Sequence, residues 1–319
     1  PWNQSYMIAG DLITKKDPYL QLDDALLRWG RSFAALSIDY RGATLQIDLL
    51  DRKGKHNGAF CHYPGLVHFK NGERVACKCN FASNAIPNQV GDGVKSTQNL
   101  FHEGGHAADK ANSEITETCM NHEYAPSSVA WAETQSMFLD TMQRSIEWLT
   151  RYAKNANGEA YPFEDYGEEV RRLTPMMPLD FMSYLRVVNF ERELYTMHDL
   201  TVEKTIEIAR RVYRKHHDME VESTFLLLIP HIYSWQTSAY YHGYGLAELT
   251  LAQWREYFYA KYGYIVDNPA VGRETREVWK LGASKTFAEF VVLATGKKLS
   301  AGAYLAGITS TVDETLSLA

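Results

Sequence analysis

Two histidines and a glutamate form an HExxH motif at His102, Glu103 and His106. Residues four apart lie on one face of a helix, so both imidazoles can reach one metal ion. Glu103 would lie beside that ion without binding it, where it can take a proton from a water that the metal activates. The motif is typical of zinc proteases; the alternative is a surface helix with two solvated histidines.

A catalytic zinc site needs a third protein ligand and keeps its fourth position for water. The metzincin pattern is excluded, because Asp109 and Asn112 stand where it requires glycine and histidine. Thermolysin-like and aminopeptidase-like spacings are excluded as well, because Ala125 and Pro126 occupy the positions of their glutamate.

Two nearby glutamates, Glu123 and Glu133, remain as candidates for the third ligand. Glu133 is the better one, because Ser127 or Ser128 can cap a helix that carries it beside an apolar face. A carboxylate at the edge of an apolar stripe is costly unless it is paired or bound to a cation. From the residues alone, an ordinary charged helix position explains Glu133 equally well.

Four stretches of the chain form a longer pattern: residues 51–60 (DRKGKHNGAF), residues 100–107 (LFHEGGHA), Glu133 with Ser136 and Asp140, and residues 230–248, which contain His231 and the run AYYHGYGLAE. In this order they resemble the catalytic region of the M3 peptidases, the group of thimet oligopeptidase and oligoendopeptidase F. The resemblance implies a mainly α fold with a small antiparallel β-sheet, a zincin-type catalytic domain over residues 1–319.

The resemblance also implies a function, the hydrolysis of short peptides by an endopeptidase with one Zn²⁺ per chain. It assigns the metal to His102, His106 and Glu133, and the role of general base to Glu103. It places His231, Tyr241 and Tyr244 on the substrate side as hydrogen-bond donors, with Tyr240 as the alternative to Tyr244. Asp140, two turns after Glu133, either orients a ligand or is an ordinary surface acid.

Three departures from the family pattern motivate a second hypothesis, a non-catalytic peptide-binding or scaffold protein. Gly104 stands where the family has a bulky residue, residues 234–238 (SWQTS) replace a glycine-rich loop, and the chain is short. Paired glycines weaken a helix, so we expect a neighbour to approach Gly104 and Gly105 closely. Retention of Glu103 favours the enzyme hypothesis, because that residue binds no metal and has no evident purpose without hydrolysis.

The first residues, PWNQSY, resemble the segment that opens the catalytic half of M3 enzymes, which are longer and have a helical N-terminal half. We therefore expect a fragment, a trimmed form or one part of a split protein. A missing N-terminal half and a separate partner chain are the two alternatives for the remaining part.

Composition limits the classes of binding partner and the cellular compartment that we expect. The 319 residues carry a net charge of -6 and contain no long basic run, which argues against nucleic acid and anionic membranes. No apolar stretch approaches the ~20 residues of a membrane span. Cys77 and Cys79 should point to one face of a strand, and free thiols in a reducing, cytoplasmic setting are the expected state of the four cysteines.

Apolar periodicity predicts a mostly helical chain with one small sheet at about 44–81. Asn71-Gly72 between two alternating runs predicts a hairpin within it. We expect the zinc helices within about 96–153 and a C-terminal helical part over about 178–319. The predicted helices cover 22–39, 96–112, 128–153, 178–199, 201–217, 223–263 with breaks, 272–281, 286–295 and 300–307.

Overall fold

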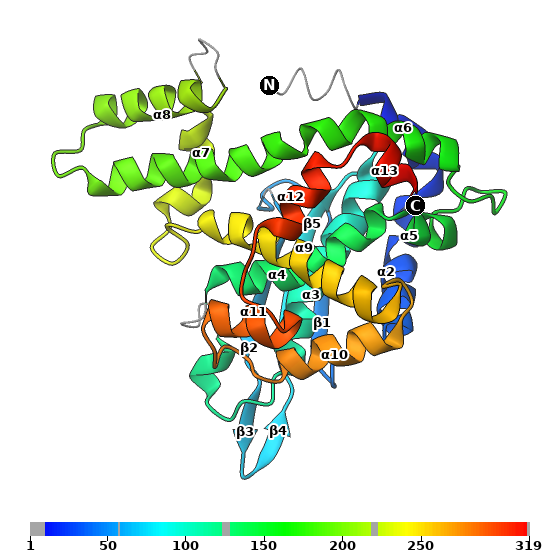
Figure 1. Ribbon diagram of the computed structural model, residues 1–319. Helices are drawn as coiled ribbons and strands as arrows, with labels where there is room; N and C mark the ends of the chain where they lie inside the picture. Colours follow the sequence, from blue (N-terminus) through cyan, green and yellow to red (C-terminus); the bar gives the residue numbers. More distant parts are fainter. Residues whose placement is uncertain (1–9, 57, 123–127, 218–222, 318–319) are drawn as a thin grey trace.

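The computed structural model describes residues 10–56, 58–122, 128–217 and 223–317, and most of them are helical (Figure 1). Glu123, Ser127 and the opening PWNQSY segment lie outside the described residues. The predicted fold class, mainly α with a small sheet, is confirmed. The longer helices are α2 (Ala25–Ala35), α3 (Asp92–Asn112), α4 (Val129–Asp140), α5 (Ile146–Tyr152), α6 (Phe163–Leu173), α7 (Met177–Thr196), α8 (Val202–His217), α9 (His242–Tyr262), α10 (Pro269–Trp279), α11 (Phe287–Thr295), α12 (Gly302–Thr309) and α13 (Val312–Ser317).

The main sheet has three strands in the order β1-β5-β2, with bounds Thr44–Leu50, Lys78–Ala85 and Phe60–Gly65. Strand β5 pairs antiparallel with β2 but parallel with β1. The sheet is therefore mixed, and the prediction that it is antiparallel was wrong for one of its two strand pairs. Alternation reveals which residues share a face but carries no information on strand direction.

The predicted hairpin is confirmed as β3 (His68–Lys70) and β4 (Glu73–Val75). Its turn residues Asn71 and Gly72 both have positive φ, 53° and 82°. A two-residue turn of this kind requires that conformation, which glycine and asparagine adopt most readily. The thiols of Cys77 and Cys79 are both buried, with their sulfurs 3.5 Å apart.

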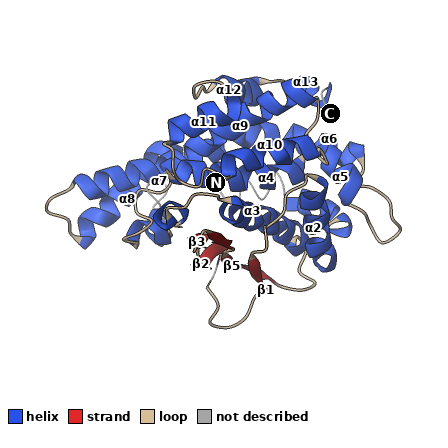
Figure 2. Cartoon of the chain, turned by 90° about the horizontal axis from the view of Figure 1, so that it is seen from below, coloured by secondary structure: helices blue, strands red, loops and turns tan. Residues whose placement is uncertain are grey.

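Helix α3 lies at the centre of the main core, with α2, α4 and β5 packed around it. Figure 2 shows the strands gathered on one side of the helices. Two glycines allow this packing. A Cβ on Gly104 would lie 2.4 Å from the indole nitrogen of Trp29 in α2, and one on Gly105 would lie 3.1 Å from the Cα of Ser136 in α4. The expected close approach to the glycine pair is therefore confirmed.

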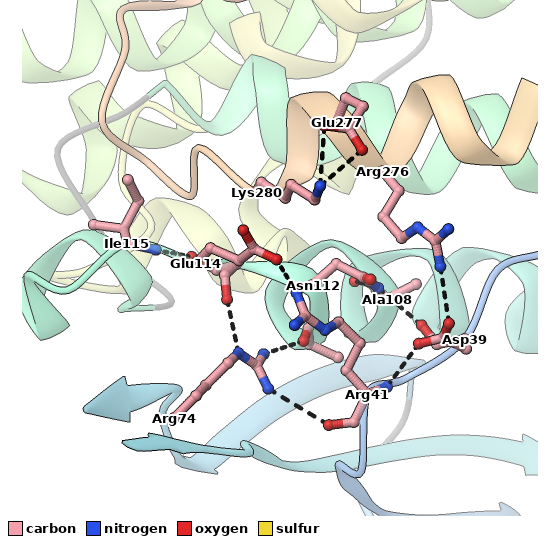
Figure 3. A network of polar contacts seen from close by, with 12 residues as sticks. Asp39, Arg41, Arg74, Ala108, Asn112, Glu114, Ile115, Arg276, Glu277 and Lys280 are labelled. Carbon is pink, nitrogen blue, oxygen red and sulfur yellow. Dashed lines mark hydrogen bonds and ion pairs between the residues drawn. The ribbon is translucent and has the colours of Figure 1, made fainter. Parts of the chain in front are cut away.

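Polar contacts join the C-terminal end of α3 to the β3-β4 hairpin and to the segment before β1 (Figure 3). Arg74 of the hairpin donates to the carbonyl oxygens of Ala111 and, at 3.1 Å, of Ser113. The Nδ2 atom of Asn112 donates to the carbonyl of Asp39 at 2.8 Å. A cation at this end satisfies free carbonyls and complements the helix dipole. These contacts fix the direction of the helix that carries the HExxH motif.

The predicted helix over 128–153 is in fact three pieces, α4, a 3-10 turn at Thr141–Arg144, and α5. Ser128 caps α4 by accepting a hydrogen bond from the amide of Ala130, and Ser145 caps α5 by accepting one from Trp148. A serine cap begins each of the two helices, so the chain starts a new helix at Ser145, which apolar periodicity did not reveal. Helix α6 was also missed.

A second, smaller core lies between α7, α8 and the two 3-10 turns at Phe225–Leu228 and Pro230–Tyr233. In Figure 1, α7 and α8 run side by side and extend away from the body of the molecule. The turns continue into the segment that leads to α9, which packs on α4. Among the described residues, no helix has the length and apolar character needed to cross a membrane.

Candidate active site

The three candidate metal ligands come from the two central helices. His102 and His106 lie one turn apart on α3, with ring centroids 5.0 Å apart, and Glu133 faces them from the second turn of α4. The Oε2 atom of Glu133 is 3.4 Å from Nε2 of His102 and 3.7 Å from Nε2 of His106. Ligand atoms of all three lie within 4.8 Å of one another. The structure therefore brings Glu133 to two histidines that precede it by 27 and 31 positions in the sequence.

These separations fit a tetrahedral zinc ion. Atoms bound to such an ion at about 2.0–2.2 Å lie roughly 3.3–3.6 Å from each other. The two nitrogen-to-oxygen distances, 3.4 and 3.7 Å, are close to that value. Two imidazoles and one carboxylate are also the ligand set of one class of catalytic zinc site, whereas structural sites use four protein ligands.

Three further side chains hold the candidate ligands in place. Asp140 Oδ2 lies 2.9 Å from Nδ1 of His102, which leaves Nε2 of that ring to face Glu133. Ser136 donates a hydrogen bond of 3.1 Å to Glu133 Oε2, and Tyr240 donates one of 2.5 Å to Oε1. A carboxylate on the far nitrogen of a ligating histidine fixes the tautomer and the direction of the ring. The direct contact between Asp140 and His102 therefore supports the orienting role considered for Asp140.

Glu103 is buried, and its charge environment suits proton transfer. Burial raises the pKa of its carboxyl to about 7; the charge of His102 opposes this, and Glu133 and Asp140 add to it. A general base works best when its pKa is near the operating pH. Glu103 thus combines the position next to the ligands with a proton affinity matched to neutral solution.

Two of the three candidate ligands, Glu133 and His106, are biased toward metal-binding protonation states. Burial alone would raise the pKa of Glu133, but hydrogen bonds from His102 and Tyr240 and the charge of His106 lower it to about 2. Burial lowers the pKa of His106 to about 4, so this imidazole is neutral at pH 7. A carboxylate and a neutral imidazole are the forms that bind a metal. Burial alone would lower the pKa of His102, but its hydrogen bonds with Asp140 and Glu133 raise it, so a metal would have to displace a proton from this ring.

The predicted substrate-side residues form an aromatic group beside Glu133. The ring of His231 lies 5.0 Å from that of Tyr240 and 5.5 Å from that of Tyr241, and Tyr244 lies 5.3 Å from Tyr241. The Nδ1 atom of His231 is buried without a hydrogen-bond partner in the described part of the chain. All four predicted residues are thus brought to one place, but Tyr240, the alternative to Tyr244, is the one that contacts Glu133.

Sequence reasoning missed two residues of α7 that hold this aromatic group, Glu191 and Tyr195. They contact the backbone at Ala239 and Ile232. The signal available in the sequence was a glutamate one residue after Phe190 in a helix face that is otherwise apolar.

Comparison with known proteins identifies the family. A family model described as Peptidase family M3 matches residues 41–310. The chain belongs to peptidase family M3. No curated protein sequence matches it.

Several solved structures share the fold of this M3 chain. The M32 carboxypeptidase from Deinococcus radiodurans R1 is 15% identical, with a TM-score of 0.64 over 99% of this chain and 67% of that one. Trypanosoma cruzi metallocarboxypeptidase 1 is 16% identical, with a TM-score of 0.63 over 97% and 67%. A structure described as oligoendopeptidase F is 17% identical, with a TM-score of 0.60 over 98% and 48%.

The likeness confirms the predicted zincin-type fold. The chain spans 67% of the length of the two carboxypeptidases and 48% of that of oligoendopeptidase F.

Proposed function

We propose that this M3-family chain is a zinc-dependent endopeptidase that hydrolyses short peptides. The observation that carries the proposal is the convergence of His102, His106 and Glu133, with the buried carboxyl of Glu103 beside them. The three residues have the chemistry and the spacing of a catalytic zinc site, and the fourth has the proton affinity of a general base.

Zinc, when bound, supplies Lewis-acid activation of a water molecule and of the peptide carbonyl. Glu103 takes the proton of the attacking water and returns it to the leaving amine. His102 and His106 would hold the metal from α3, and Glu133 would hold it from α4. Asp140 keeps the ring of His102 in the direction that metal binding requires.

The aromatic group beside Glu133 supplies the hydrogen-bond donors for the substrate. The rings of His231 and Tyr244 lie 5.0 and 5.5 Å from that of Tyr240, and Tyr241 packs against both His231 and Tyr244. In the proposed function, these side chains donate to the carbonyl oxygen as it becomes negative. Donors fixed in advance stabilise such charge strongly, because they need no reorganisation during the reaction. Tyr244 stacks on Tyr184 of α7, with centroids 5.5 Å apart, which restrains its ring.

The test compares zinc content and peptide cleavage in the wild type and in Glu103→Gln. Internally quenched fluorescent peptides report cleavage, and Glu117→Gln, at an exposed position after α3, serves as the matched control. We expect Glu103→Gln to keep its zinc and to lose about 10²–10⁴-fold in rate, while Glu117→Gln behaves as the wild type. Zinc-loaded wild type that is no faster than Glu103→Gln would favour the scaffold hypothesis.

A carboxypeptidase is the second candidate activity, because two of the similar structures are described as carboxypeptidases. Peptides with an amidated C-terminus separate the two activities, since an endopeptidase does not need a free terminal carboxylate. We expect mass spectrometry to show, from amidated peptides, an N-terminal and a C-terminal fragment produced by cleavage of an internal bond. If the only products arise by removal of residues from a free C-terminus, the carboxypeptidase proposal replaces the endopeptidase one.

A further inference from the structure

The segment that leads from His231 to Tyr240 is fastened to α7 at two points. The backbone amide of Ala239 donates a hydrogen bond of 2.8 Å to Oε1 of Glu191. The hydroxyl of Tyr195 lies 2.9 Å from the carbonyl oxygen of Ile232, to which it donates, and 3.2 Å from the same Glu191 oxygen. Both ends of the segment are therefore held by neighbouring turns of one helix.

Glu191 is buried, with 3% of its surface exposed, beside the second core. Its neighbours on α7 in that core are Val187, Phe190 and Leu194. A position needed for packing alone would be apolar, because a buried carboxylate is costly unless its oxygens have partners. The described partners of this carboxylate are the Ala239 amide and the Tyr195 hydroxyl.

Ala239 has a φ of 55°, a left-handed conformation that residues with a Cβ rarely adopt. Such a conformation persists only where the surroundings hold it in place. The next residue is Tyr240, whose hydroxyl reaches Glu133. A single run of contacts thus joins the Glu191 carboxylate to the candidate metal ligand through a strained backbone position.

We propose that Glu191 is a positioning residue of the peptidase site. By holding Ala239 in its left-handed conformation, it places the Tyr240 and Tyr241 side chains against Glu133 and the substrate. This inference rests on the proposed peptidase function, and Glu191 touches neither metal nor substrate. Glu191 must supply a hydrogen-bond acceptor, and glutamine supplies one on a side chain of the same length.

The experiment uses the whole zinc-loaded chain and two independent readouts. Hydrogen exchange of the peptide that covers residues 229–241 reports how firmly the Ala239 amide is held. kcat and KM on a quenched peptide, measured at saturating zinc, report catalysis. Glu193→Ala is the matched control, because Glu193 lies on the same helix and pairs with Arg211 of α8 away from the site.

We expect Glu191→Ala to speed exchange at Ala239 about 10-fold and to lower kcat by about 10–100-fold, with a smaller change in KM. Glu191→Gln should resemble the wild type in both readouts, because its amide oxygen can take the place of Oε1 and accept from the Ala239 amide, while Tyr195 keeps its hydrogen bond to the Ile232 carbonyl. Adding Ala239→Gly to Glu191→Ala should recover part of kcat, since glycine adopts positive φ without strain. Glu193→Ala should change neither readout.

Wild-type kcat in Glu191→Ala, or a loss in Glu191→Gln as large as in Glu191→Ala, would overturn the inference. If Glu191→Ala does not fold, Tyr195→Phe carries the test through the second attachment point, and an unchanged kcat would overturn it. Failure of the proposed function looks different: no variant, nor the wild type, would cleave peptide, while the exchange readout would still report whether Glu191 holds the segment.

Discussion

The hydroxyl of Tyr240 donates a hydrogen bond of 2.5 Å to Oε1 of Glu133, while the other oxygen of that carboxylate faces His102 at 3.4 Å. The two oxygens of Glu133 therefore have separate tasks. Oε1 accepts from Tyr240, and Oε2 faces the two imidazoles. A hydrogen bond of this kind restricts the conformation of a ligand side chain before the metal binds.

Replacing Tyr240 by phenylalanine should weaken zinc binding about 10-fold, because Glu133 loses the partner that holds its Oε1 atom. Competition with a chromogenic chelator measures the change. Tyr264→Phe, at a half-exposed tyrosine after α9, is the matched control and should leave the affinity unchanged. Equal zinc affinities in Tyr240→Phe and the wild type would contradict the role given to this contact.

Replacing Asp140 by asparagine should lower zinc affinity by about 10–100-fold, because a neutral amide polarises and orients the His102 ring less than a carboxylate does. The same chelator competition applies, with Asp313→Asn at an exposed position of α13 as the control. Asp140→Asn with wild-type affinity would mean that packing alone orients the ring.

Gly104→Ala should destabilise the protein by about 1–3 kcal/mol, because the new Cβ would lie 2.4 Å from the Trp29 indole nitrogen. Gly30→Ala is the matched control within α2, where an added Cβ has nothing within 4 Å. It should stabilise the helix by up to about 1 kcal/mol. Urea unfolding checks both, and equal effects of the two changes would contradict the close packing of α2 on α3.

Glu248 should make stability depend on pH. Burial raises the pKa of its carboxyl to about 7, from 4.5, helped by the charges of Asp140 and Asp180 and opposed by that of Arg144. The folded state then binds more protons than the unfolded state between about pH 4.5 and 7. The free energy of unfolding therefore falls as the pH rises through this window.

Glu248→Gln removes that loss, so it should be more stable than the wild type by about 1–3 kcal/mol at pH 8 and equal to it at pH 4. Urea unfolding of the metal-free protein across this range measures the difference. Glu256→Gln, at an exposed position of α9, controls for the change of residue type. A variant no more stable than the wild type at pH 8 would show that the Glu248 carboxylate is well solvated.

The sequence predicted all three candidate ligands but not how they are assembled. HExxH places His102 and His106 on one face of a helix by spacing alone. Glu133 needed more, because it comes from α4, and the approach of α4 to α3 depends on Gly105 meeting the backbone near Ser136. That approach is a tertiary contact, which local periodicity does not encode.

Two other features lay beyond the sequence for physical reasons. The direction of β1 relative to β5 depends on the path of the intervening chain, which alternation does not specify. The choice between Tyr240 and Tyr244 depended on the left-handed residue Ala239, which precedes α9 and breaks any helical spacing. Non-helical backbone at a site is where sequence patterns carry least information.

Anomalous diffraction at the zinc edge, from crystals of the zinc-loaded protein, tests the central claim most directly. We expect one peak between α3 and α4, within about 2.0–2.2 Å of His102 Nε2, His106 Nε2 and a Glu133 carboxylate oxygen. Zinc bound by the two histidines with both Glu133 oxygens far beyond that distance, or a peak elsewhere in the molecule, would contradict the proposed catalytic centre.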